Sequence, residues 1–283
     1  MRVGYIILAH HKPRQLGRLV RALRAESGGP IFIHVDRRAP EMLAQTVDML
    51  RGVADVTVRS HHKVTWGGFG IVAAALEGLS HLLADTSVGH IQHLSGQDYP
   101  IKPVGAFEAM AQASPDTSFM ECQALPRSDW PPDGGMYRIR HWYLKTGVRP
   151  IRLPVKRALP PGITFYGGSA FWCLARAHAQ FALTSGLRDF FRHAFVSDEL
   201  FFQTVLMNSP WRDAIADRPM CYTSWSGNAR SPKTLGRQDL EALAQAPHYF
   251  ARKFDADIDS QVLDQLDRAA GRVLPSAGGQ GQQ

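Results

Sequence analysis

The chain has 283 residues, 45% of them hydrophobic, which is enough for the core of one large α/β domain or two small ones. No apolar run is long enough to span a membrane, and the short apolar segment at the N-terminus favours a buried first strand over a signal peptide. The net charge of +7 favours an anionic partner, but the basic residues are scattered and no nucleic-acid-binding motif occurs. We therefore expect no nucleic-acid partner, and a phosphorylated small molecule accounts for the charge as well.

The first half of the sequence alternates short apolar segments with helical patterns. Segments rich in Ile and Val predict strands at residues 3–10, 30–36, 54–60 and 90–96. Apolar residues at helical spacing predict helices between and after them, at 14–26, 40–52 and 71–85. This alternation is typical of a doubly wound, mostly parallel sheet, which binds ligands beyond the carboxyl ends of its strands.

Residues 120–162 break the alternation, because they are rich in Pro, Arg and aromatic residues and have no helical period. We predict a long ordered loop there, and such loops are often functional. Beyond it the sequence predicts a strand at 168–176 and helices at 197–209, 238–246 and 260–269. Three widely spaced cysteines without a CxxC pattern favour reduced thiols and a cytoplasmic protein: Cys122, Cys173 and Cys221.

Five short motifs occur in an order that resembles the core-2/I-branching glycosyltransferase family: SGQDYPI, GGSAFW, DELFFQTVLMNSP, RSPKTL and FARKFD. That family includes the β-1,6-N-acetylglucosaminyltransferases and the peptide O-xylosyltransferases, and the likeness is strongest to the xylosyltransferase branch. It extends from about Tyr5 to Leu266. The resemblance implies a GT-A fold, a UDP-sugar donor, inversion at the anomeric carbon, and basic side chains that bind the diphosphate in place of a metal.

On this resemblance we expect a single glycosyltransferase domain over residues 1–272. Its donor-binding half covers about 1–122, and its acceptor-binding and catalytic half covers about 123–272. The remaining residues, 273–283, are rich in Gly and Gln and are expected to be disordered.

Glu199 is the candidate general base. It lies at the start of the predicted helix 197–209, where Ser197 can cap the helix and an acidic side chain complements its dipole, so a purely structural role is the alternative. Inverting transfer requires a carboxylate that takes the proton of the acceptor hydroxyl. The resemblance places the catalytic base of the family at Glu199.

Three residues at strand ends are candidates for binding the donor. Asp98 follows the strand that ends near residue 96 and is expected to contact the donor sugar, with a turn role as the alternative. Asp36 ends the second strand and is expected to accept a hydrogen bond from the nucleoside, or else to cap a turn. His10, in the first turn between strand and helix, is a candidate neighbour of the uridine.

Arg252 and Lys253 are expected to bind the diphosphate and to offset the charge that builds up as UDP leaves. The resemblance places a second phosphate-binding cation at Arg230, with Lys233 as the fallback. The overlapping Asp-x-Asp pattern that follows, residues 255–259, precedes a helix and is interpreted as structural. An ordinary basic surface is the alternative for all four cations.

No metal or other cofactor is expected. The adjacent pairs His10-His11 and His61-His62 do not suit chelation, because neighbouring side chains on a strand point to opposite faces. Trp66 is expected to line the donor pocket. The glycines that follow it allow a close backbone approach to a phosphate, but a packing loop is the favoured interpretation.

The acceptor is expected to contact Arg138, Trp225 and Ser169. Arg138 belongs to a basic and aromatic cluster, and the alternative interpretation of this cluster is a solvated basic loop. Trp225 offers an apolar face for a sugar ring, or else belongs to the core. Ser169 lies in the GGSAFW motif of the resemblance.

We therefore predict an inverting, metal-independent transferase that moves xylose or N-acetylglucosamine from a UDP-sugar to a glycan, a lipid-linked glycan or a peptide. The alternative is a non-catalytic nucleotide- or glycan-binding protein on the same fold. A basic face suits peripheral contact with an anionic membrane, at the inner face if the protein is cytoplasmic.

Overall fold

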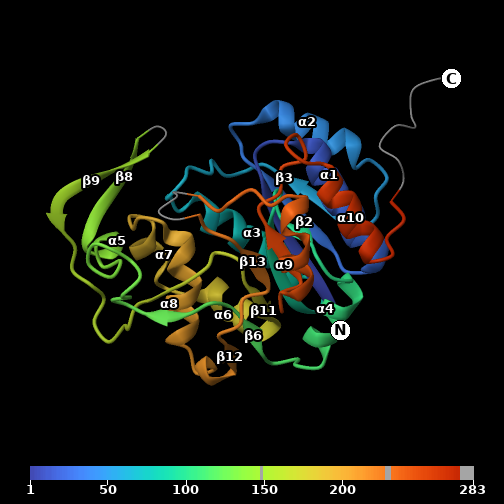
Figure 1. Ribbon diagram of the computed structural model, residues 1–283. Coiled ribbons are helices and arrows are strands. Elements are labelled where there is room, and N and C mark those ends of the chain that lie inside the picture. Colours follow the sequence, from blue (N-terminus) through green and yellow to red (C-terminus); the bar gives the residue numbers. More distant parts are fainter. Residues whose placement is uncertain (147–148, 227–230, 275–283) are drawn as a thin grey trace.

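The computed structural model describes residues 1–146, 149–226 and 231–274. A seven-stranded sheet forms its centre, with helices on both faces (Figure 1). The strand order is β12-β6-β11-β4-β1-β2-β3. The pairs β1–β2, β1–β4, β2–β3 and β12–β6 are parallel, and β11 is antiparallel to both of its neighbours. The predicted α/β class with a mostly parallel sheet is confirmed.

The strands of this sheet are short and mostly buried. They are β1 (Arg2–Ala9), β2 (Ile31–Val35), β3 (Val56–Arg59), β4 (Val88–Ser95), β6 (Ser118–Phe119), β11 (Cys173–Ala175) and β12 (Ile215–Ala216). Smaller sheets contain β5 (Tyr99–Pro100), β7 (Gln123–Ala124), β8 (His141–Thr146), β9 (Arg149–Lys156), β10 (Tyr166–Gly167), β13 (Cys221–Thr223) and β14 (Phe250–Arg252). The central sheet takes strands from both halves of the chain.

Helices cover the two faces of the sheet. They are α1 (Pro13–Glu26), α2 (Pro40–Met49), α3 (Gly70–Leu83), α4 (Val104–Gln112), α5 (Tyr137–Arg140), α6 (Arg176–Thr184), α7 (Arg188–Phe191), α8 (Phe201–Met207), α9 (Leu240–Gln245) and α10 (Gln261–Ala269). Short 3-10 turns are η1 (Ser197–Glu199), η2 (Arg212–Ala214) and η3 (Arg237–Asp239). The helices and strands predicted in the first half therefore occur where the sequence patterns place them.

Two hydrophobic clusters, one on each side of the sheet, form the core. Along β1, Tyr5 and Ile7 face the cluster that contains α1, α4 and α10, whereas Ile6 faces the cluster that contains α3, α6 and α8. Alternate side chains of a strand point to opposite faces, so a strand in the middle of the molecule must be apolar at every position. This explains why β1 is a continuous apolar run.

The parallel register brings the functional strand ends to one edge of the sheet. Leu8 of β1 lies opposite Ser95 of β4, and Ala9 lies opposite Val35 of β2. The residues that follow these strands therefore meet at the carboxyl edge, which is where open α/β sheets bind ligands.

Two expectations about elements were wrong. The segment 120–162 is not a long loop, because α5 and the antiparallel hairpin β8–β9 lie within it. The helix predicted at 197–209 is interrupted: a 3-10 turn over Ser197–Glu199 precedes the short helix α8. Ser197 does not cap α8, since its hydroxyl donates to the carbonyl oxygens of Phe191 and Ala194.

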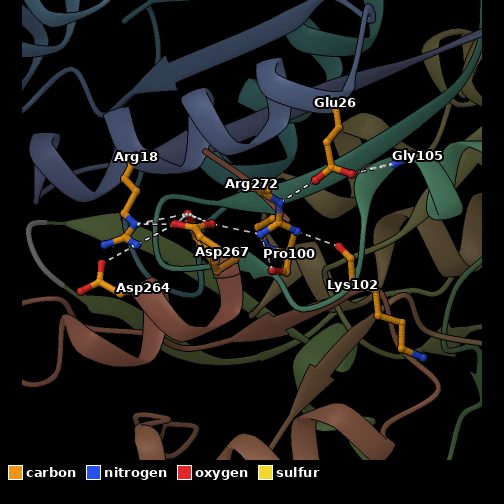
Figure 2. A network of polar contacts seen from close by, with 9 residues as sticks. Arg18, Glu26, Pro100, Lys102, Gly105, Asp264, Asp267 and Arg272 are labelled. Atoms are coloured by element: carbon orange, nitrogen blue, oxygen red, sulfur yellow. Dashed lines mark hydrogen bonds and ion pairs between the residues drawn. The ribbon is translucent and has the colours of Figure 1, made fainter. Parts of the chain in front are cut away.

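A buried ion network attaches α10 to the body of the domain (Figure 2). Arg272, whose side chain is fully buried, donates to Glu26 at 2.6 Å and to Asp267 at 3.1 Å. Arg18 of α1 contacts the other carboxylate oxygen of Asp267 at 2.6 Å, and Tyr99 donates to Asp267 at 2.8 Å. These contacts hold α10 and the residues that follow it against α1 and the segment 99–102.

Within the described residues, no helix is long and apolar enough to cross a membrane. The predicted disordered tail lies outside these residues from position 275 onward.

Candidate active site

A buried ion pair lies just beyond the carboxyl end of β4. The Nε of Arg252 donates to Oδ1 of Asp98 at 3.1 Å, and the Asp98 side chain is fully buried. Ser95 also donates to Asp98, through its hydroxyl at 2.6 Å and its backbone N–H at 2.8 Å. Burial raises the pKa of Asp98, and Arg252 and Ser95 offset part of that rise. In this arrangement Asp98 holds Arg252 and has no surface open to a sugar.

Aromatic and neutral groups surround the other side of Arg252. Its guanidinium lies over the ring of Phe171 at 3.9 Å, and Phe171 stacks on His93. Burial lowers the pKa of His93 to about 4, so the imidazole is neutral at pH 7. One face of Arg252 is thereby held against an apolar ring, while its charge remains available to an anion.

Glu199 forms an ion pair with Arg138 of α5. The Nη1 of Arg138 lies 2.6 Å from Oε2 of Glu199, and the Glu199 side chain keeps 36% of its surface exposed. The Arg138 guanidinium in turn lies 3.8 Å from the centre of the Trp130 ring. The carboxylate is therefore oriented by a fixed cation, and an acceptor hydroxyl can reach it from the solvent side.

The segment 168–171 connects Glu199 with Arg252. The backbone N–H of Gly168 donates to the carbonyl oxygen of Glu199 at 3.0 Å, and Phe171 lies beneath Arg252. Ser169 lies between them; its N–H donates to Glu121 and its carbonyl oxygen accepts from Gln203 of α8 at 2.7 Å. Thus the GGSAFW motif connects the candidate base to the candidate phosphate-binding residue.

Asp198 is a second carboxyl group in this region. Its Oδ1 is buried and has no hydrogen-bond partner among the described residues. Burial raises its pKa to about 7, and the neighbouring charge of Glu199 adds to the rise, whereas Arg138 and Arg252 oppose it. Asp198 therefore interacts electrostatically with the arginines of both ion pairs.

The backbone before Glu199 is in a conformation that valine rarely adopts. Val196 has φ of 51° and ψ of 53°, in the left-handed region. Its N–H donates to the carbonyl oxygen of Gly67 at 2.9 Å, and the N–H of Glu199 donates back to Val196 at 3.2 Å. A left-handed β-branched residue costs about 1–2 kcal/mol, so tertiary contacts must hold this turn.

Trp66 lies beside this turn and is 61% exposed, with its ring edge against Phe195. Gly67, with φ of 70°, packs against Phe195 so closely that a Cβ atom would lie 2.7 Å from that ring. The glycines after Trp66 thus serve packing, as the sequence favoured, while the exposed indole is free to contact a ligand.

Asp36 and His10 lie at the ends of neighbouring strands. Asp36 is buried, and its carboxylate contacts the guanidinium of Arg38 at 2.7 Å. Burial opposes the ionisation of Asp36, but the side-chain and backbone hydrogen bonds from Arg38 hold its pKa below the usual value. His10 is exposed, and its ring lies tilted against that of His11, with the ring centres 4.1 Å apart. Arg38 is a residue that the sequence did not single out.

The three remaining predicted cations differ in what is known of their surroundings. Lys253 is half-buried, and its ammonium has no hydrogen bond or ion pair with any residue in the described part of the chain. Lys233 is paired with Asp239 at 2.5 Å. Arg230 lies outside the described residues.

The C-terminal aspartates have structural partners. Lys12 forms ion pairs with both Asp255 and Asp257. Asp259 accepts hydrogen bonds from the first N–H groups of α10, those of Gln261 and Val262. These contacts agree with the interpretation of the aspartates as structural.

The histidine pair His61-His62 differs from the expectation that its rings diverge. Both rings contact the carboxylate of Glu77, at 2.6 and 3.1 Å, because the two residues lie beyond the end of β3 and not on a strand. In the described ranges, no group of three or more His, Cys, Asp or Glu side chains could hold a metal ion.

Trp225 is 58% exposed, so the alternative of a core tryptophan is wrong. Arg138 is largely buried on Glu199 and Trp130, so the alternative of a solvated loop is wrong for this residue, whereas Arg140 and Trp142 of the same cluster are exposed. The sequence did not single out three further site residues: Trp130, Phe171 and Glu121. Of these three, only Phe171 lies in a motif of the family resemblance, GGSAFW, so only Phe171 could have been found from the sequence.

Comparisons with known proteins identify the family of the chain. The Core-2/I-Branching enzyme family model matches residues 3–244. The chain is 28% identical to xylosyltransferase 2 of Canis lupus familiaris and 26% identical to xylosyltransferase 1 of Homo sapiens, over 94% of its own length in both cases.

It spans 33% and 30% of the lengths of those two relatives. Among solved structures, it is similar to a putative glucose-1-phosphate thymidylyltransferase from Bacillus anthracis, with a TM-score of 0.44, 12% identity and 97% of each chain covered. The family match covers most of the chain. The chain therefore belongs to the Core-2/I-Branching enzyme family, a family of glycosyltransferases.

Proposed function

We propose that this glycosyltransferase moves a sugar from a UDP-sugar to an acceptor hydroxyl with inversion, and that Glu199 is the general base. The observation that supports this most is the arrangement of two ion pairs joined by one segment. Glu199 is oriented by Arg138 and stays accessible, and Arg252 is held by buried Asp98. Such an arrangement suits a base on one side of the anomeric carbon and a diphosphate on the other.

In the proposed step, the acceptor oxygen attacks the anomeric carbon while its proton passes to Glu199. The bond between that carbon and the β-phosphate oxygen breaks, and UDP leaves with the bonding electrons. Arg252 and the ammonium of Lys253, which has no ion pair among the described residues, offset the charge that appears on the β-phosphate, so that no divalent ion is required. Asp36, Arg38 and His10 lie at the strand ends where the nucleoside is expected.

Xylose is the favoured sugar, since the relatives named above are xylosyltransferases. N-acetylglucosamine remains the alternative, and a pocket shaped for the smaller sugar excludes the larger one. The acceptor is a glycan, a lipid-linked glycan or a peptide, with Trp225, Ser169 and Arg138 as its candidate contacts. Thermal shifts with UDP-xylose and UDP-N-acetylglucosamine distinguish the donors, because a ligand that binds only the native state raises its stability.

The test of the mechanism is Glu199→Gln, with Glu41→Gln, an exposed carboxylate on α2, as the matched control. We expect transfer to fall by about 10²–10⁴-fold, because the proton acceptor is lost. The affinity for UDP should change little, because the substitution alters Glu199 and its ion pair with Arg138 but leaves Arg252 and Lys253 in place. Retention of half of the wild-type turnover contradicts the role of Glu199. NMR of the product should show the anomeric configuration opposite to that of the donor.

A further inference from the structure

The hairpin β8–β9 projects from the domain beside α5 and α7, on the side away from α2 and α10 (Figure 1). It forms a two-stranded sheet of its own, with Leu144 opposite Ile151. The base of the hairpin is fixed: Tyr143 is 5% exposed, stacks on Phe195, and donates its N–H to the carbonyl oxygen of His193 at 3.0 Å. The hairpin therefore projects from the domain, is fixed at its base, and has one face directed away from the core.

The free side of the hairpin is apolar. Leu144 is 40% exposed, Ile151 is 55% exposed and Val155 is 59% exposed. Leu144 and Ile151 are cross-strand neighbours, so their side chains share one face. Contiguous aliphatic groups on a projection are typical of an interaction surface, unlike apolar residues scattered singly.

Exposed cations accompany these apolar groups. Arg140, Arg152 and Lys156 are exposed on the same hairpin and at its base, and Arg152, which lies opposite Tyr143, is on the other face of the hairpin from Leu144 and Ile151. In the sequence, no Asp or Glu occurs between Asp133 and Asp189, so nothing on the hairpin neutralises them. The hairpin segment therefore carries a net positive charge, in a chain whose net charge is already +7.

We propose that the β8–β9 hairpin docks on an anionic lipid bilayer. Aliphatic side chains enter the boundary between headgroups and acyl chains, while flanking Lys and Arg side chains bind anionic headgroups. A polyanionic glycan or a nucleic acid matches the cations but leaves the exposed aliphatic groups in water. The combination on one projection therefore favours a bilayer.

The location of the hairpin relates this surface to the candidate base. The helix α5 leads directly into β8, and Arg138 of α5 contacts Glu199. If the proposed function holds, docking brings the bilayer surface next to Glu199. The docking itself does not depend on the transferase mechanism.

The experiment is co-sedimentation of the full chain with vesicles of phosphatidylcholine alone and with added phosphatidylglycerol. The charge variant is Arg152→Gln with Lys156→Gln, and the apolar variant is Leu144→Ser with Ile151→Ser. Arg51→Gln and Val47→Ser, exposed residues on and just after α2, are the matched controls.

We expect binding only to the anionic vesicles, with a strong decrease as salt rises. The charge variant should bind about 30-fold more weakly, from roughly 1 kcal/mol for each cation near the surface. The apolar variant should bind at least about 10-fold more weakly, and the controls should bind as the wild type. Equal binding to both vesicle types, or unchanged binding by both hairpin variants, overturns the proposal.

Two further measurements distinguish failure of the docking proposal from failure of the proposed function. Light scattering shows whether the hairpin instead joins two copies of the chain, in which case the apolar variant becomes monomeric and vesicle binding is absent. Glu199→Gln should sediment with vesicles as the wild type does. Retained vesicle binding with unchanged transfer in Glu199→Gln contradicts the proposed function and leaves the docking surface intact.

Discussion

Asp98 and Arg252, separated by more than half of the chain, form an ion pair in which the carboxylate is fully buried and the guanidinium is partly open. Asp98 also accepts two hydrogen bonds from Ser95, so its oxygens are directed into the protein. This finding changes the role predicted for Asp98. We now propose that it is a positioning residue, which orients Arg252 toward the diphosphate.

The first prediction concerns the coupling between these two residues. Removing one partner of a buried ion pair leaves an uncompensated charge, at a cost of about 3–5 kcal/mol. Asp98→Asn and Arg252→Gln should each destabilise the protein and weaken UDP binding. The double variant should lose clearly less stability and binding free energy than the two single variants lose together. Urea unfolding and calorimetric titration with UDP measure the terms of this double-mutant cycle. Additivity within about 0.5 kcal/mol shows that the residues act independently.

The second prediction concerns the diphosphate. Lys253→Ala should reduce transfer by at least about 100-fold, because one charge partner of the leaving group is lost. Transfer by the wild type should be unchanged in EDTA. Lys233→Ala is the comparison, since its ammonium is already neutralised by Asp239. If Lys233 binds the phosphate in place of Lys253, Lys233→Ala should lose transfer and Lys253→Ala should keep it. Strict dependence on Mn²⁺ or Mg²⁺ with an active Lys253→Ala contradicts metal independence.

The third prediction follows from Asp198, whose pKa is raised to about 7 by burial and by Glu199. In the unfolded chain an aspartate has a pKa of about 3.9. Between these values the native state binds more protons than the unfolded state, so stability should fall as pH rises from about 4 to 7.

Asp198→Asn removes this titration. We therefore expect a weaker decline of the melting temperature with pH, and a variant that is more stable than the wild type above pH 7. Thermal unfolding of both proteins from pH 5 to 8 measures the difference. Parallel profiles indicate that Asp198 is already ionised at pH 5.

The fourth prediction concerns the network in Figure 2. Arg272→Ala leaves Glu26 and Asp267 without their shared cation in a buried site, so the free energy of unfolding should fall by about 3–5 kcal/mol. Arg268→Ala, an exposed arginine of α10, should change it by no more than about 0.5 kcal/mol. Urea denaturation provides both values. Equal effects of the two substitutions indicate that the network contributes little.

Much of the fold and part of the candidate site were predictable from the sequence. The continuous apolar run of β1 and the helical spacing in α1 and α3 are local patterns, and each specifies its element whatever lies around it. The order of elements then determines the α/β class. It also places His10, Asp36 and Asp98 at one edge, because parallel strands align their carboxyl ends.

Only the tertiary structure decided what those residues contact. Asp98 is turned toward Arg252, Asp36 toward Arg38, and Arg138 toward Glu199, and no local pattern encodes these partners. The left-handed turn at Val196 and the hairpin β8–β9 were missed for the same reason. Contacts with Gly67, Phe195 and His193 stabilise them, and those contacts exist only when distant segments of the chain have come together.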